Sequence, residues 1–330
     1  MSEPVATSST SLIPNARQAT RPLSPLNLAA RRFRKHRMAS VGLYLLGFLF
    51  VYITLGSLLS RGYCAPLKKD LTGEAYANCN DTSLKLQAPS REHIFGTDVI
   101  GRDIFARTIY GGQISVMIGI SAAFVEVLLG ALVGAVAAYY GGWVDSILMR
   151  ITEAMLNIPS LFLLIIGARF FGGGLPSLNF FGRELTGSVI VIILIIGATS
   201  WMYLARIVRA NILSLRERDY ISASRALGAS DARIIFAHLL PNTIAPLVVS
   251  ATLGVASAII SEAYVSFLGL GVQGATATWG NMLDGAYQYL ETAPWLWFFP
   301  GTLILLTVLG INFVGDGLRD ALDPYSTRHV

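Results

Sequence analysis

The sequence predicts an all-α integral membrane protein with six transmembrane helices. Its 330 residues are 53% hydrophobic and 14% charged, whereas soluble domains carry about 25% charged residues. The mean hydropathy is +0.57. Apolar runs recur along the chain, and a helix of about 20 such residues crosses the roughly 30 Å hydrocarbon core of a bilayer. The composition excludes a disordered chain, a collagen and a disulfide-dense secreted scaffold.

Six apolar runs are the predicted spans, and polar or Gly/Pro-rich connections separate them. They cover residues 41–59, 114–138, 152–170, 187–205, 243–266 and 296–314. We expect the first run to be a span rather than a cleaved signal peptide, because 40 residues precede it and such a peptide lies at the extreme N-terminus.

The positions of Lys and Arg predict the orientation, since basic residues near span ends stay on the cytoplasmic side. Seven basic residues precede the first span: Arg17, Arg21, Arg31, Arg32, Arg34, Lys35 and Arg37. The connection 206–242 holds six arginines, while the opposite loop 269–294 holds no Lys or Arg. Loop 60–112 is nearly neutral, with seven basic and six acidic residues. Both termini are therefore predicted to be cytoplasmic. The basic residues behind the net charge of +5 lie beside the membrane spans, so this charge does not predict a nucleic-acid partner.

The segments outside the spans differ in composition. Residues 1–30 are rich in Ser, Thr, Pro and Arg and predict a flexible cytoplasmic tail, and residues 321–330 predict a second one. Residues 31–92 comprise a basic segment, the first span and an extracytoplasmic insertion. Cys64 and Cys79 lie in that insertion. They form a disulfide or remain two free thiols, because spacing alone does not decide between the two.

The chain lacks the motifs of an enzyme. None of its four lysines follows a glycine or precedes Ser or Thr, so it has no phosphate-binding Walker A loop. The four histidines are scattered, without an H-E-x-x-H or Cys/His group that would bind a metal. A G-x-S-x-G nucleophile turn is also absent. We expect no cofactor on this chain and no catalysis by it; any ATP and Mg²⁺ are used by partner subunits.

The connection 218–242 predicts two short helices that form a protruding knob. Ile221, Ala223, Ala226 and Leu227 recur at helical spacing. Gly228 permits a sharp turn, and a second helical pattern runs from Asp231 to Leu240 before Pro241 breaks it. Small side chains let such a knob enter a groove on a partner protein, whose movement then pulls on the attached helices.

This connection resembles the EAA loop of permease subunits from binding-protein-dependent ABC importers. Ala223, Gly228, Leu240 and Pro241 match the signature, whereas Ser222, Ser224 and His238 replace its Glu, second Ala and Ile. The forms R-A-L-G-A-S-D at 225–231 and H-x-L-P-N at 238–242 resemble the peptide/nickel subfamily. Segments 93–116, 157–165 and 261–271 resemble C-type subunits of dipeptide and oligopeptide permeases, so the resemblance covers about residues 31–320.

The resemblance implies the transmembrane-domain fold of a type I ABC importer over residues 93–320, with cytoplasmic coupling helices. It implies four kinds of partner: a homologous B-type permease, two ATP-binding subunits, an extracytoplasmic solute-binding protein and the lipid of the inner membrane. It also implies that the ATPase-docking residues are Ser222, Ala223, Ser224, Arg225, Ala226, Leu227, Gly228, Ala229, His238 and Pro241. The implied function is peptide import by alternating access.

Three residues inside the spans are candidates for the translocation pathway: Glu126, Pro159 and Glu262. Glu126 is the deepest carboxylate, and an ionisable group in hydrocarbon usually faces a cavity or a partner. Its alternative role is a polar contact with another helix or subunit. Import of nickel, glutathione or another small solute, a secondary transporter, and a structural membrane protein remain alternative functions.

Overall fold

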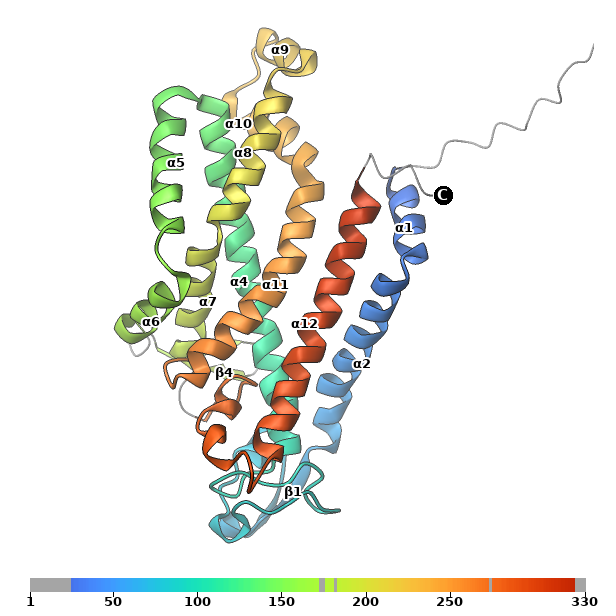
Figure 1. Cartoon of the computed structure of the whole chain (residues 1–330), viewed down its shortest axis with the longest axis vertical. Helices are drawn as coiled ribbons and strands as arrows, with labels where there is room; N and C mark the ends of the chain where they lie inside the picture. Colours follow the sequence, from blue (N-terminus) through green and yellow to red (C-terminus); the bar gives the residue numbers. More distant parts are fainter. Residues whose placement is uncertain (1–24, 172–175, 181–182, 273–274, 324–330) are drawn as a thin grey trace, which may run out of the picture.

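The computed structural model describes residues 25–323 except 172–175, 181–182 and 273–274. The helices form an elongated bundle along one axis (Figure 1). We name its two ends after the elements found there, the α9 end and the β1 end. The predicted tails at 1–24 and 324–330 lie outside the described residues.

Helices dominate the chain. Those before the knob are α1 (Pro25–Lys35), α2 (Arg37–Leu59), α3 (Gly73–Ala77), α4 (Ile104–Tyr140), α5 (Gly142–Leu156), α6 (Ser160–Phe171), α7 (Gly187–Ser200) and α8 (Met202–Arg216). Those from the knob onward are α9 (Asp219–Ala226), α10 (Asp231–Arg233), α11 (Ile244–Phe267) and α12 (Trp295–Leu322). Two antiparallel hairpins pair β1 (Arg61–Cys64) with β2 (Lys69–Thr72) and β3 (Leu178–Phe180) with β4 (Arg183–Leu185).

Six spans are present if each of two bent helix pairs counts as one. Within the described residues, four uninterrupted helical stretches are long and apolar enough to cross a membrane: Arg37–Leu59, Ile104–Tyr140, Asp231–Phe267 and Trp295–Leu322. The pair α5 and α6 bends by 88°, and the pair α7 and α8 by 45°. The predicted span at 152–170 therefore contains a sharp break: Pro159 lies in it, where it lacks the N–H that would continue helix α5.

Helix α4 is the centre of the bundle and packs against α2, α7, α8 and α11. Asp103 caps its N-terminus, where the Asp103 carboxylate accepts a 2.8 Å hydrogen bond from the Ala106 N–H. Its 37 residues correspond to a length of about 55 Å. Gly130 and Gly134 face α8 so closely that a Cβ at either would lie within 3.0 Å of α8 atoms. These small residues let α4 and α8 approach each other.

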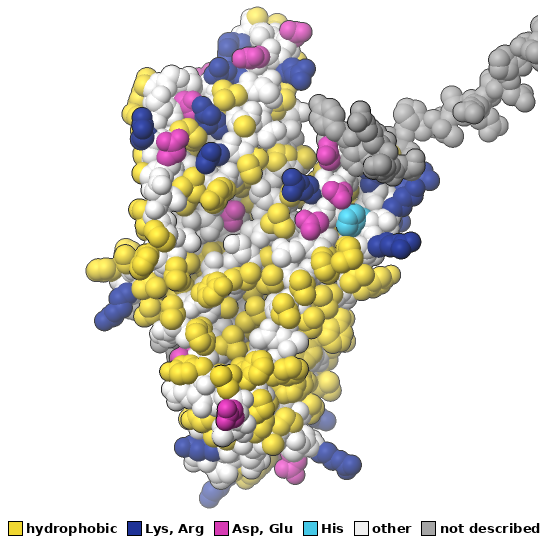
Figure 2. All heavy atoms as spheres, in the orientation of Figure 1, with side chains coloured by type: hydrophobic (Ala, Val, Ile, Leu, Met, Phe, Trp, Pro, Cys, Tyr) yellow, Lys and Arg dark blue, Asp and Glu magenta, His cyan; other side chains and the backbone are white. Residues whose placement is uncertain are grey.

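The outer surface matches a lipid environment. Figure 2 shows hydrophobic side chains across the middle of the bundle, with Lys and Arg mostly toward its two ends. Large apolar side chains of α2 such as Tyr44, Phe48 and Phe50 are exposed. Such an apolar surface would be unfavourable in water and is suited to acyl chains.

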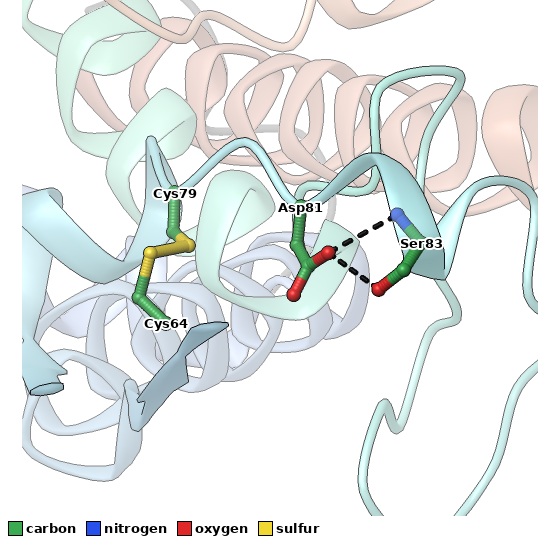
Figure 3. Close-up of a disulfide and its surroundings, with 4 residues drawn as sticks. All are labelled: Cys64, Cys79, Asp81 and Ser83. Atoms are coloured by element: carbon green, nitrogen blue, oxygen red, sulfur yellow. Dashed lines mark hydrogen bonds between the residues drawn. A yellow bond between two sulfur atoms is a disulfide. The ribbon is translucent and has the colours of Figure 1, made fainter. Parts of the chain in front are cut away.

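The β1 end is closed by a compact loop structure. Cys64 and Cys79 form a disulfide, which decides between the two predicted alternatives (Figure 3). Next to it the Asp81 carboxylate accepts hydrogen bonds from the Ser83 N–H at 3.1 Å and hydroxyl at 2.6 Å. Trp279, which is fully buried, donates a 2.8 Å hydrogen bond from its indole to the Thr108 carbonyl.

The predicted boundaries change at three places. Residues 25–30, expected in the flexible tail, form the first turns of α1, which packs against α12, and α12 itself extends to Leu322. Pro241 does not break the second knob helix, because the stretch Asp231–Phe267 is helical throughout. A π-helical segment (Ile234–Leu239) and a 3₁₀ turn (Leu240–Thr243) lie at the proline. Their altered hydrogen-bond spacing accommodates a residue that has no N–H.

Candidate functional site

A cavity of about 420 Å³ lies inside the bundle between α4, α5, α6, α7, α8 and α11. Two of the three predicted pathway residues, Glu126 and Pro159, line it. Hydroxyl groups from several helices line it as well, among them Ser160, Thr199, Ser250 and Ser257. The cavity therefore places hydroxyl groups and one carboxyl group beside apolar side chains in the apolar region of the protein.

Glu126 points a carboxylate at this cavity from the middle of α4. The side chain is half-buried, and no other side chain or N–H of the described residues forms a hydrogen bond or ion pair with it. Gly254 of α11 faces it, because a Cβ at that position would lie 2.7 Å from Glu126 Oε2. The carboxylate is thus close to the α11 backbone and available to a ligand.

Glu262 occupies a different environment. It is 1% exposed, and three hydroxyls bond its carboxylate: Ser266 at 2.6 Å, Thr278 at 2.7 Å and Ser115 at 3.3 Å. The Ser115 and Thr278 oxygens in turn accept hydrogen bonds from the N–H groups of Trp279 and Asn281. Glu262 therefore joins α4, α11 and the loop after α11, and it does not line the 420 Å³ cavity.

The knob at 218–242 protrudes at the α9 end of the bundle (Figure 1). Seven predicted docking residues are exposed: Ser222, Ala223, Arg225, Ala226, Leu227, Gly228 and Pro241. Ser224, Ala229 and His238 are half-buried. Leu227 is 89% exposed. Gly228 has a φ of +81°, a conformation that favours glycine. The turn thus presents an uncovered apolar side chain beside a tight bend.

Comparison with known proteins identifies the family. Residues 127–327 match the family described as binding-protein-dependent transport system inner membrane component. Residues 24–86 match the N-terminal transmembrane domain of oligopeptide transport permease C. The chain belongs to this permease family. The resemblance inferred from the motifs is therefore confirmed.

The sequence of this permease aligns with individual relatives over nearly its whole length. The chain is 42% identical to the dipeptide transport system permease protein DppC of Alkalihalophilus pseudofirmus over 92% of this chain and 90% of the relative. It is 37% identical to the oligopeptide transport system permease protein OppC of Bacillus subtilis over 90% of this chain and 88% of the relative. Among solved structures, the inward-facing MetNI methionine ABC transporter matches with a TM-score of 0.50 at 21% identity, over 67% of this chain and 98% of that chain. This last match supports the transmembrane fold.

The knob of the permease is attached to α4 by contacts that the sequence did not reveal. The Tyr139 hydroxyl donates a 2.6 Å hydrogen bond to Asp231, and the Arg225 guanidinium lies 5.6 Å from the centre of the Tyr139 ring. Ile221 is fully buried in a cluster that includes Ile212 of α8. No local pattern signals the pairing of Tyr139 with Asp231, because the two residues are 92 positions apart.

The serines of α11 that line the cavity could have been found from their spacing in the sequence. Ser250, Gly254, Ser257 and Ser261 recur every three or four residues within the apolar run of α11. This spacing places them on one helix face, and all four line the cavity. This row of serines and a glycine predicts the side of α11 that faces the cavity. Glu262 follows Ser261 directly in the sequence and lies on a different face of the helix.

At the β1 end, His93 and Asp103 connect the preceding loop to the start of α4. His93 Nδ1 lies 2.8 Å from Asp103 Oδ2, and both side chains are buried. The hydrogen bond to the carboxylate raises the pKa of His93 above its ordinary value of 6.5, against the opposing effect of burial. Nowhere in the described part of the chain do three or more His, Cys, Asp or Glu side chains form a group that could hold a metal ion.

Proposed function

We propose that this permease is the C-type membrane subunit of an ABC importer that carries di- or oligopeptides across the inner membrane. The names of its relatives support the substrate class. In this assembly a homologous second permease completes the pathway, and an extracytoplasmic binding protein delivers the peptide. Two ATP-binding subunits hydrolyse ATP with Mg²⁺, and this chain performs no catalysis itself.

One observation carries the mechanism: the stretch Asp231–Phe267 is helical from the knob to the cavity wall. Its first turn contains Asp231, which Tyr139 binds, and its middle contains Ser250 and Ser257, which line the cavity. A continuous helical stretch can transmit a displacement along its axis, so a push on the knob would reach the cavity. ATP binding would move the knobs of both permeases together and open the cavity to the other side.

The orientation follows from the same assignment. The α9 end, with the arginine-rich knob connection, lies in the cytoplasm together with both termini. The β1 end lies outside, where an oxidising environment maintains the Cys64–Cys79 disulfide.

Co-purification tests the proposed assembly. The chain is tagged at its C-terminus, native membranes are solubilised in mild detergent, and stoichiometric partners are identified by mass spectrometry. We expect a second multi-span permease and ATPases with Walker motifs. A chain that purifies alone, or only with itself, contradicts the ATP-driven mechanism and favours a secondary transporter.

A peptide uptake assay tests the substrate class. Proteoliposomes containing the purified complex and internal ATP are supplied with binding protein loaded with a radiolabelled dipeptide. We expect accumulation that requires ATP. Accumulation of nickel or glutathione but not of peptides contradicts the peptide assignment while leaving the importer assignment intact.

A further inference from the structure

We propose that Glu126 binds the α-ammonium group of the transported peptide within the cavity. This inference rests on the proposed function, because it assigns a ligand group to the pathway of a peptide importer. It names a binding contact of the permease itself, separate from the selection that the binding protein makes first.

The Glu126 carboxylate has no partner among the described residues. Neither carboxylate oxygen forms a hydrogen bond or an ion pair with any of the described residues. A carboxylate surrounded by protein in the apolar region of a membrane is costly unless a cation or hydrogen-bond donors compensate it. Glu262 shows how the same protein satisfies a carboxylate that has a structural role, with three hydroxyl donors.

The ionisable groups of the cavity wall favour a ligand with a positively charged group. Among its described lining residues Glu126 is the single ionisable carboxylate, and none is Lys, Arg or His. The wall therefore presents one carboxyl group and several hydroxyls. A ligand with a positively charged group and amide groups complements this surface: the ammonium pairs with Glu126, and hydroxyls bond to peptide carbonyls and N–H groups.

The cavity also has room for a small peptide. The cavity of about 420 Å³ lies within the roughly 300–1,000 Å³ range of small-molecule sites. Gly254 keeps the α11 side of Glu126 open, since a Cβ there would lie 2.7 Å from Oε2. The hydroxyls of Ser250, Ser257 and Ser261 follow along the same face of α11. A peptide whose N-terminus lies at Glu126 can extend along this row.

The binding is expected to be weak. A transporter must release what it binds, so a single charged contact combined with neutral hydroxyls suits a site of passage better than a fully enclosing site. One such contact is expected to change the transport rate by about tenfold, which corresponds to about 1.4 kcal/mol.

The test compares a dipeptide with its N-acetylated form, which lacks the ammonium group. Purified binding protein is loaded to measured saturation with either peptide and added to proteoliposomes that contain the intact importer complex and internal ATP. The readout is the ratio of the two transport rates per loaded binding protein. This loading step removes the contribution of the binding protein's own affinity.

For the wild-type complex we expect the free dipeptide to be transported about tenfold faster than the acetylated one. Glu126→Gln is expected to reduce this ratio to about two or less, and Glu126→Asp, which keeps the charge, to retain most of it. The matched control is Glu153→Gln, because Glu153 is an exposed carboxylate of α5 that does not line the cavity. Its ratio should equal that of the wild type.

Three results would overturn the inference. They are a wild-type ratio near one, an unchanged ratio in Glu126→Gln, and loss of transport of both peptides by an assembled Glu126→Gln complex. The last result would assign Glu126 to a contact with the second permease instead. A wild-type complex that transports no peptide at all contradicts the proposed function, which makes the two failures distinguishable.

Discussion

Two carboxylates on neighbouring membrane helices show how differently this protein uses the same side chain. Glu262 is 1% exposed and has three hydroxyl partners. Glu126 is half-buried, has no partner within the described residues and lines a cavity. A polar group that is fully hydrogen-bonded on all sides stabilises a fold, whereas one that is left open is available for a ligand.

The same contrast holds for the two ends of the bundle. The β1 end contains the Cys64–Cys79 disulfide, the Glu262 cluster and the His93–Asp103 hydrogen bond. The α9 end presents Leu227 at 89% exposure on a turn that depends on Gly228. We therefore expect changes at the β1 end to lower stability and changes at the knob or cavity to alter transport. Four predictions test this difference.

The largest expected effect is on transport and comes from Gly228→Trp at the knob. A non-glycine residue at a φ of +81° is strained by about 1–2 kcal/mol, and the indole would obstruct docking. No atom lies within 4 Å of an added Cβ, so folding and membrane insertion should be intact. We expect peptide uptake to fall at least 100-fold at normal membrane levels of the chain.

Gly142→Trp is the matched control for this change. Gly142 also has a positive φ and open space around it, but it is the first residue of α5 and lies outside the knob. Its uptake should stay close to wild type. Normal uptake by Gly228→Trp would contradict the role of the knob in transmitting motion.

The largest expected effect on stability comes from Glu262→Leu. Removing the carboxylate leaves three buried hydroxyls without their acceptor, at about 1–3 kcal/mol each. Thermal unfolding of the purified chain in detergent should show a loss of at least about 3 kcal/mol. Glu126→Leu removes no hydrogen bond and should leave the unfolding temperature within experimental error. Equal losses in both variants would remove the distinction between the two carboxylates.

Removal of the disulfide should have a similar but slightly smaller effect. Cys64 and Cys79 are 15 positions apart, and closing a loop of that length stabilises a fold by about 3 kcal/mol. We expect the double variant Cys64→Ser/Cys79→Ser to unfold at lower temperature, and a reducing agent to shift only the wild type. A wild type that does not respond to reduction while the double variant is destabilised would show that the serines, rather than the missing bond, cause the loss.

The smallest effect is the pH dependence of the His93–Asp103 hydrogen bond. Because the folded-state pKa of His93 is raised above 6.5, its stabilising contribution is fully present below about pH 6.5 and is lost as the pH rises through the folded-state pKa. The contribution is on the order of 1 kcal/mol. The difference in unfolding temperature between wild type and His93→Gln should therefore shrink with rising pH. A difference that grows with pH would reverse the assigned sign.

Local patterns predicted much of the fold. The long apolar runs marked the spans, because twenty residues without charge suit the hydrocarbon core whatever their neighbours are. Gly228 marked the knob turn, because a residue with a positive φ favours glycine. Pro159 and Pro241 show the limit of such rules. The chain bends by 88° at the first and stays helical through the second, since neighbouring backbone turns decide whether a missing N–H is accommodated.

By itself, the sequence determined the class of protein, the positions of the apolar segments and the family, because these depend on composition, periodicity and short motifs. Only the tertiary structure decided that Glu262 is enclosed and Glu126 open, and that Tyr139 holds the knob. Hydrogen-bond partners such as Ser115 and Glu262 lie 147 positions apart. Their meeting depends on how α4 and α11 pack, and that packing is a property of all the side chains between the helices rather than of any one segment.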